Sequence, residues 1–144
     1  MKNFHVTVGD HTAFSKTVGE SDVYLFAGIT GDLSPNHVNE EYMKQSSYGR
    51  RMAHGALIVG YMSTASTMAI VESRSSQEET PVSLGYDRIR FLKPVFLNDT
   101  ITVNYTISAI DLERRRSVAN IEVINQEGIL VAVAQHILKW VKNS

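Results

Sequence analysis

Residues 52–71 read MAHGALIVGYMSTASTMAIV, a run of 20 residues with no formally charged side chain. That length would span a bilayer, but the run holds His54 and four Ser and Thr side chains and lacks aromatic anchors at both ends. We therefore predict a helix about 27 Å long that is buried in the protein and not in a membrane. Because the helix is apolar or small on nearly every face, other elements must enclose it.

The residues after this helix predict the sheet that encloses it. Residues 100–110 (TITVNYTISAI) alternate apolar side chains, from Ile101 to Ala109, with polar ones, as a half-buried strand does. Further strands are expected over residues 117–125, 129–141, 82–92 and 11–18. One long helix wrapped by a curved, mainly antiparallel sheet of about five strands is an α+β roll, the hot-dog fold. Sandwich and doubly wound folds are disfavoured because the strands cluster after the helix.

Two short helices are expected before the long one. Ser21 or Asp22 can cap a helix that ends at Gly31, and Asn39 can cap a helix over residues 40–45. In the second helix Glu40 and Lys44 are spaced as an i, i+4 pair. Residues 72–80 (ESRSSQEET) predict an exposed, mobile link from the long helix to the sheet.

Composition narrows the class of protein. The 144 residues are 43% hydrophobic and 20% charged, which predicts one globular domain over residues 1–144. With 14 Lys and Arg against 15 Asp and Glu, no positive field favours nucleic acid or an anionic membrane. Without cysteine, the chemistry falls to His, Asp, Glu and hydroxyl groups. The N-terminal residues lack the apolar core of a secretory signal, so we expect a cytoplasmic protein.

The loop Gly31-Asp32-Leu33-Ser34-Pro35-Asn36-His37 places a carboxylate and an imidazole five residues apart. A neutral histidine can accept a proton near neutral pH and a neighbouring carboxylate can share or return it, which suits the addition of water to a double bond. The same residues also form an ordinary turn and helix cap, and that structural interpretation stays open.

His54-Gly55 stands at the expected start of the long helix. The first N–H groups of a helix have no intrahelical partner, and the helix dipole is positive there. Without a Cβ, Gly55 would let a substrate oxygen approach the backbone, so this end could bind the carbonyl of a thioester as it becomes an enolate. The alternative is a small residue that packs the helix against the sheet.

Together these segments resemble the MaoC-like dehydratase family, the (R)-specific enoyl-CoA hydratases. Their signature is a Gly-Asp-x-Asn-Pro-x-His loop followed by His-Gly at the start of the central helix. The resemblance extends to residues 26–30 (FAGIT), to residues 90–95 (RFLKPV) and to Asp99-Thr100. Nearly the whole chain is therefore similar to this family.

The resemblance implies roles for single residues. Asp32 and His37 would jointly activate water, and the amide of Gly55 would bind the thioester carbonyl. Ser63 occupies a place where some members keep a hydroxyl near the Asp, and Ser34 and His54 are expected to bind substrate. Ser34 stands where the family usually has Asn, and Asn36 where it usually has an apolar residue, so we expect the hydrogen bonding of the water or acyl group to differ from the family pattern.

The implied reaction interconverts a trans-2-enoyl thioester and an (R)-3-hydroxyacyl thioester, carried by coenzyme A or acyl carrier protein, without a cofactor. Asp32, His37 and His54 could be taken as a metal triad, but no metal-binding spacing supports it and no metal is predicted. The alternatives are a hot-dog thioesterase, which relies on a carboxylate on or beside the central helix, and a non-catalytic acyl-thioester-binding subunit. Residues 53–71 contain no Asp or Glu, which favours hydration.

The remaining charged residues are expected to be mostly solvated. One or two of a set of cations could meet the phosphates of coenzyme A: Arg50, Arg51, Arg88, Arg90 and Lys93. Residues 114–116 are expected at a solvated hairpin tip, and His5, His11 and His136 receive no role. A single roll leaves one face of its sheet and the catalytic loop exposed, so a homodimer is expected.

Overall fold

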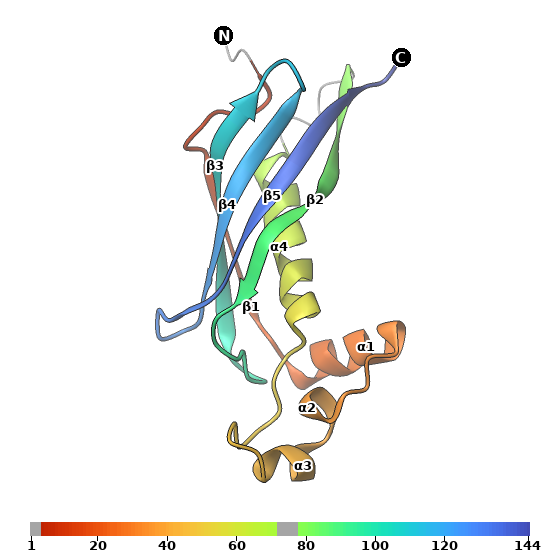
Figure 1. Ribbon diagram of the computed structural model, residues 1–144, viewed down its shortest axis with the longest axis vertical. Helices are drawn as coiled ribbons and strands as arrows, with labels where there is room; N and C mark the ends of the chain where they lie inside the picture. Colours follow the sequence, from red (N-terminus) through yellow and green to blue (C-terminus); the bar gives the residue numbers. More distant parts are fainter. Residues whose placement is uncertain (1–3, 72–77) are drawn as a thin grey trace.

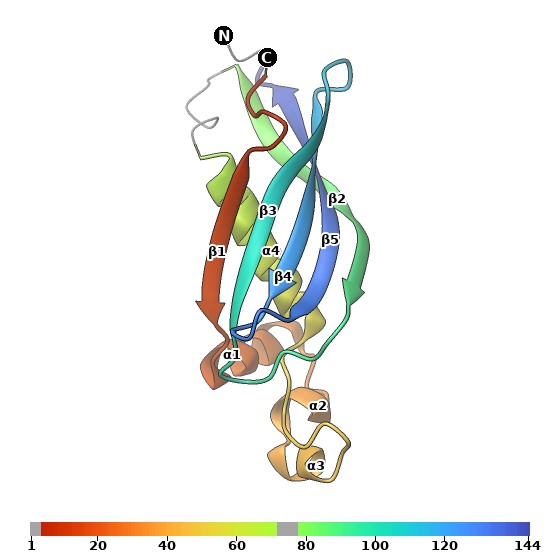
Figure 2. The same ribbon diagram turned by 90° about the vertical axis from the view of Figure 1, so that its left-hand side faces the viewer.

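The computed structural model describes residues 4–71 and 78–144. Its strands are β1 (His11–Thr17), β2 (Glu79–Phe91), β3 (Thr100–Asp111), β4 (Arg116–Ile124) and β5 (Leu130–Lys142). They form one antiparallel sheet in the order β1-β3-β4-β5-β2 (Figure 1). The helix α4 (Gly55–Ala69) lies along one face of this curved sheet, as the turned view shows (Figure 2). The predicted α+β architecture and its five strands are confirmed.

The core lies between α4 and the inner face of the sheet. Alternation holds on β3, where Ile101, Val103, Tyr105 and Ile107 are buried and pack with residues of the same kind on β4 and β5. A register shift between β3 and β4 follows Ile107, so Ala109 is exposed. Its predicted inward position is wrong, because a bulge changes the face to which later residues point.

Helix α4 is shorter and more open than predicted. It begins at Gly55, because Met52 forms a β-bridge with Phe96 and the Ala53 N–H donates to the Val95 carbonyl at 2.7 Å. One face packs on the sheet through three buried residues, Ile58, Met62 and Ala65. The opposite face is exposed at Ala56, Gly60, Ser63 and Thr67. The expectation that other elements enclose nearly every face is therefore wrong for a single chain.

No helix within residues 4–71 and 78–144 is long and apolar enough to cross a membrane. Helix α4, which carries most of the uncharged run, has 15 residues. That length gives a rise of about 22 Å, short of the hydrocarbon core of a bilayer.

Three helices gather at the end of the sheet where α4 begins (Figure 1): α1 (Glu20–Thr30), α2 (Pro35–Val38) and α3 (Glu40–Lys44). Gly19, and not Ser21 or Asp22, is the N-cap of α1, and the Asp22 carboxylate accepts from the Gly19 N–H at 2.9 Å. The predicted end at Gly31 is confirmed, as is the Asn39 cap, whose side chain accepts from the Tyr42 N–H.

The charged pairs around α3 differ from the prediction. Lys44 pairs with Glu41 at 2.9 Å, whereas Glu40 receives a hydrogen bond from Arg51 at 2.6 Å. Glu40 lies closer to a cation brought in by the chain before α4 than to Lys44 on its own helix. A long-range contact has replaced the expected local one.

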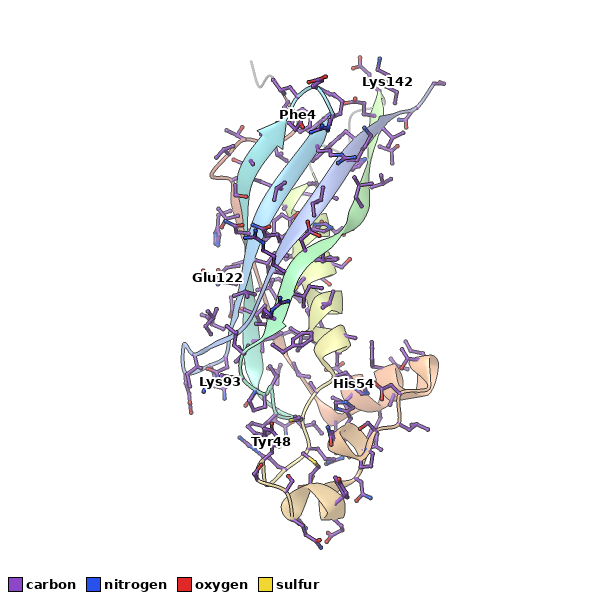
Figure 3. The ribbon with its side chains drawn as sticks, viewed as in Figure 1. Phe4, Tyr48, His54, Lys93, Glu122 and Lys142 are labelled. Atoms are coloured by element: carbon purple, nitrogen blue, oxygen red, sulfur yellow. The ribbon has the colours of Figure 1, made fainter. Side chains whose placement is uncertain are left out.

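An ion-pair cluster stands at the other end of the sheet, where Phe4 and Lys142 lie (Figure 3). Glu79 is only 6% exposed and accepts hydrogen bonds from Arg115 and from His5, the latter at 2.6 Å. Residues 72–77 of the predicted link lie outside the described residues, but Glu79 and Thr80 belong to β2. The expectation of an exposed Glu79 is wrong, because Arg115, at the predicted hairpin tip, compensates its charge.

Candidate active site

A tight turn after α1 presents Asp32. Gly31 ends the helix with φ 81°, a left-handed conformation that glycine adopts without strain. The Asp32 N–H donates to the Thr30 hydroxyl at 3.2 Å, and the Asp32 carboxylate accepts from the Ser34 N–H at 3.3 Å. Two local hydrogen bonds thus hold an exposed carboxylate in a defined place.

His37 lies on α2, so it sits on a short helix and not on a loop as predicted. Its Nδ1 lies 2.6 Å from the Met52 carbonyl oxygen. Because a carbonyl can only accept, Nδ1 carries the hydrogen and Nε2 of the neutral ring keeps a free lone pair. Burial, together with the neighbouring His54, lowers the pKa of His37 below its ordinary value, although the Met52 bond and Asp32 act in the opposite direction. The ring is therefore suited to act as a base near neutral pH.

His54 packs directly against this pair. It is the N-cap residue of α4 and 2% exposed, and its Nε2 lies 3.0 Å from the backbone carbonyl oxygen of Asp32. Its ring stacks on that of His37 with centroids 3.7 Å apart, and Phe26 packs on it at 4.7 Å. Among the described residues, no group pairs with its Nδ1.

A pocket of about 290 Å³ opens beside His37 and Gly55. Figure 3 shows Tyr48, Lys93 and His54 around this end of the molecule. Residues from three segments line the pocket: His37; Tyr48, Met52, Ala53, Gly55 and Ile58; and Phe91, Leu92, Lys93 and Pro94. Most of this lining is apolar, as expected for a site that takes an acyl chain.

Gly55 is the first residue of α4, so its N–H has no acceptor within the helix. The Phe91 ring packs onto it so closely that a Cβ on residue 55 would lie 2.5 Å from the ring. Both interpretations of this glycine thus have support: it packs closely, and its N–H is at a helix start beside a pocket.

The structure brings together most of the predicted site residues. One atom each of Asp32, His37 and His54 lies within 4.8 Å of the others, and Ser34, between Asp32 and His37 in the sequence, is the N-cap residue of α2. Ser63 is apart, because eight residues of α4 separate it from Gly55 by about 12 Å. Its hydroxyl bonds to Tyr86, on the sheet. The proximity of Ser63 to Asp32 stays a prediction.

The three clustered side chains include groups that could ligate a metal ion, namely the Asp32 carboxylate, Nε2 of His37 and Nδ1 of His54. However, the two rings are stacked with only 27° between their planes. Each ring also uses its other nitrogen on a backbone carbonyl. That arrangement is unlike a set of converging ligands, and the absence of a metal stays our prediction.

Sequence reasoning missed several pocket residues. The sequence carries no signal for Tyr48. Met52 contributes its backbone carbonyl, which a pattern of side chains does not reveal. Phe91 and Lys93 lie in the segment 90–95 on which the family resemblance rested, so that signal was present but could not show that they face the pocket.

A sequence profile of the MaoC like domain matches residues 4–128. The chain belongs to this family. A (R)-specific enoyl-CoA hydratase of Rhodospirillum rubrum is 33% identical over 108 residues, which cover 74% of this chain and 69% of that protein. A 3-hydroxybutyryl-CoA dehydratase of Methylorubrum extorquens is 31% identical over 111 residues, which cover 76% of this chain and 66% of that protein.

The fold of this MaoC-like chain is also that of a solved hydratase. The (R)-hydratase from A. caviae involved in PHA biosynthesis superimposes with a TM-score of 0.82. The match covers 96% of this chain and 98% of the other, at 21% sequence identity. At that identity the likeness establishes the shared hot-dog fold.

Proposed function

We propose that this protein is an (R)-specific enoyl-thioester hydratase. It would add water to a trans-2-enoyl thioester to give an (R)-3-hydroxyacyl thioester, and catalyse the reverse dehydration. The observation that carries this proposal is the free Nε2 of His37, beside the Asp32 carboxylate and in the same pocket as Gly55. Base, carboxylate and helix N–H are the three groups that the reaction requires.

Hydration follows from these groups. Nε2 of His37 takes a proton from water while the water oxygen bonds to C3 of the substrate. The electron pair of the C2–C3 double bond moves toward the carbonyl, whose oxygen becomes an enolate that the Gly55 N–H stabilises. C2 then receives the proton back through the His37–Asp32 pair as the enolate collapses. One water is added, and the protein ends in its starting protonation state.

The substrate test uses crotonyl-CoA with the purified protein. Loss of the enoyl absorbance without free thiol, together with (R)-3-hydroxybutyryl-CoA as the product, is expected. Release of free thiol would instead indicate the thioesterase. No change in either signal, with binding of the thioester, would indicate the non-catalytic subunit. Helix α4 has neither Asp nor Glu, which disfavours hydrolysis.

Coenzyme A is the carrier that we favour. Of the five cations considered above, Arg51 is occupied by ion pairs with Glu20 and Glu40. Lys93 lines the pocket, and its side chain makes no hydrogen bond or ion pair within the described part of the chain. A free ammonium group at the pocket suits a phosphate of coenzyme A. The same substrate would place the protein in the cytoplasm.

We also propose that the protein is a homodimer. Helix α4 leaves one face of small residues open, and β2 is an edge strand with Val82 and Leu84 exposed. A second copy would cover such surfaces. Sedimentation at micromolar concentration should show a dimer, and a fully active monomer would contradict the proposal. A different partner chain would show as a monomer that is inactive alone.

A further inference from the structure

His54 is the most completely buried polar group at the site, and the hydration mechanism does not use it. It is 2% exposed, so its ring offers little surface to a substrate in the pocket. Yet it contacts both residues of the proposed acid–base pair, Asp32 and His37. Its contribution must therefore pass through the residues that it holds.

The first contact is with Asp32. Nε2 of His54 lies 3.0 Å from the Asp32 carbonyl oxygen, and a carbonyl only accepts, so Nε2 carries the hydrogen and donates. This bond ties the turn after α1 to the N-cap residue of α4, 22 positions along the chain. Without it, the local bonds of the turn would still shape the loop but would not fix its distance from the pocket.

The second contact is with His37. The centroids of the two rings lie 3.7 Å apart, and the Phe26 ring packs on His54 with its centroid 4.7 Å away. The Met52 carbonyl fixes His37 in its own plane, while the His54 ring limits motion out of that plane. Residues 52 and 54 thus hold His37 from two directions.

We infer that His54 is a positioning residue that holds the Asp32 turn and the His37 ring at one fixed separation for water activation. This inference rests on the proposed hydratase function. A general base must lie within hydrogen-bond reach of the proton that it takes, and a misplacement of about 1 Å can cost about 10²-fold in rate. The buried ring supplies that precision without touching the substrate.

Two substitutions separate the donor from the ring. His54→Phe keeps a flat ring for stacking but loses the N–H group, whereas His54→Gln keeps an N–H donor of similar reach and loses the ring. We expect His54→Phe to lower kcat for crotonyl-CoA by about 10- to 100-fold with little change in KM. His54→Gln should be more active than His54→Phe, because it retains the bond to Asp32. His11→Phe, at an exposed histidine on β1, is the matched control.

A role in packing alone gives the opposite order, with His54→Phe at the parental rate and His54→Gln impaired, and that result would overturn the inference. If His54→Phe does not fold, His54→Leu serves as the donor-free variant in the same comparison with His54→Gln.

An NMR titration of the His37 ring tests the inference independently of turnover. Because His54 helps to lower the pKa of His37, the variants should titrate at higher pH than the parent. If the parent protein does not hydrate crotonyl-CoA, the proposed function fails, and this titration still decides whether His54 acts on His37. An unchanged His37 titration in both variants would contradict the positioning role.

Discussion

The ring of Phe91 rests on Gly55 so closely that a Cβ on residue 55 would lie 2.5 Å from Cε2 of Phe91. The ring is the outer end of a side chain that is 55% exposed, so it can move at modest cost. Gly55→Ala should therefore fold but displace Phe91, and the added methyl should also push a substrate carbonyl from the helix start. We expect kcat to fall by about 10²–10³, with a smaller change in KM.

Phe91→Ala provides the control, because it removes the ring that the new methyl would meet. If Gly55 serves the carbonyl, the double variant should be as stable as Phe91→Ala and still much less active than it. A double variant with the activity of Phe91→Ala would reduce Gly55 to a packing residue.

Asp32→Asn and His37→Gln should each lower the hydration rate by about 10²–10⁴, since each removes a proton acceptor with little change in size. Assays with crotonyl-CoA would measure the hydration rate of each variant, and thermal melts would measure its folding stability. Both variants should melt near the parent, because the side chain of Asp32 is exposed and that of His37 only half-buried. Parental activity in either one would refute the shared activation of water.

The pH dependence of hydration should follow His37. The base works only when neutral, and burial lowers its pKa from the ordinary value of 6.5. The midpoint of the acid-side decline in kcat/KM should therefore lie below pH 6.5. A midpoint above pH 6.5 would contradict the assignment of His37 as the base.

Sequence patterns predicted the elements that depend on interactions between residues close together in the chain. Alternation along residues 100–110 predicted β3, and Gly31 marked the end of α1, because both depend on neighbours in sequence. The start of α4 at His54-Gly55 was also predicted, but the contacts that keep Met52 and Ala53 out of the helix are long-range: these residues pair with Phe96 and Val95, more than 40 residues away in the chain. No pattern within residues 52–71 contains that information.

The candidate site shows the same division. The motif predicted Asp32 and His37, but their shared contact with His54 depends on the approach of α1 to the start of α4. Likewise, a polar stretch predicted an exposed link, whereas Glu79 is buried by Arg115 from a distant hairpin. Compensation of one charge by another is a property of the tertiary structure.

Lys93→Ala should raise KM for crotonyl-CoA by about 2- to 5-fold and leave kcat unchanged. This factor corresponds to the free energy of one exposed ion pair. Crotonyl pantetheine lacks the phosphates of coenzyme A, so its KM should be the same for parent and variant. Lys142→Ala, at the opposite end of the sheet (Figure 3), is the matched control. An equal rise in KM for both thioesters would mean that Lys93 contacts another part of the substrate.

Glu79→Gln should destabilise the fold in a way that depends on pH. The hydrogen bonds from Arg115, with a smaller contribution from His5, lower the pKa of Glu79 from 4.5 to about 2. A carboxylate whose pKa is lower in the folded state stabilises the protein fully above pH 4.5, and this contribution is lost as the pH falls toward 2. At pH 7 the variant should melt about 5 °C below the parent, and this difference in melting temperature should narrow between pH 4.5 and 2.

Glu122→Gln, at an exposed position on β4, is the control and should have the melting temperature of the parent at every pH. A gap for Glu79→Gln that stays constant down to pH 2 would show that shape, and not charge, makes Glu79 stabilising.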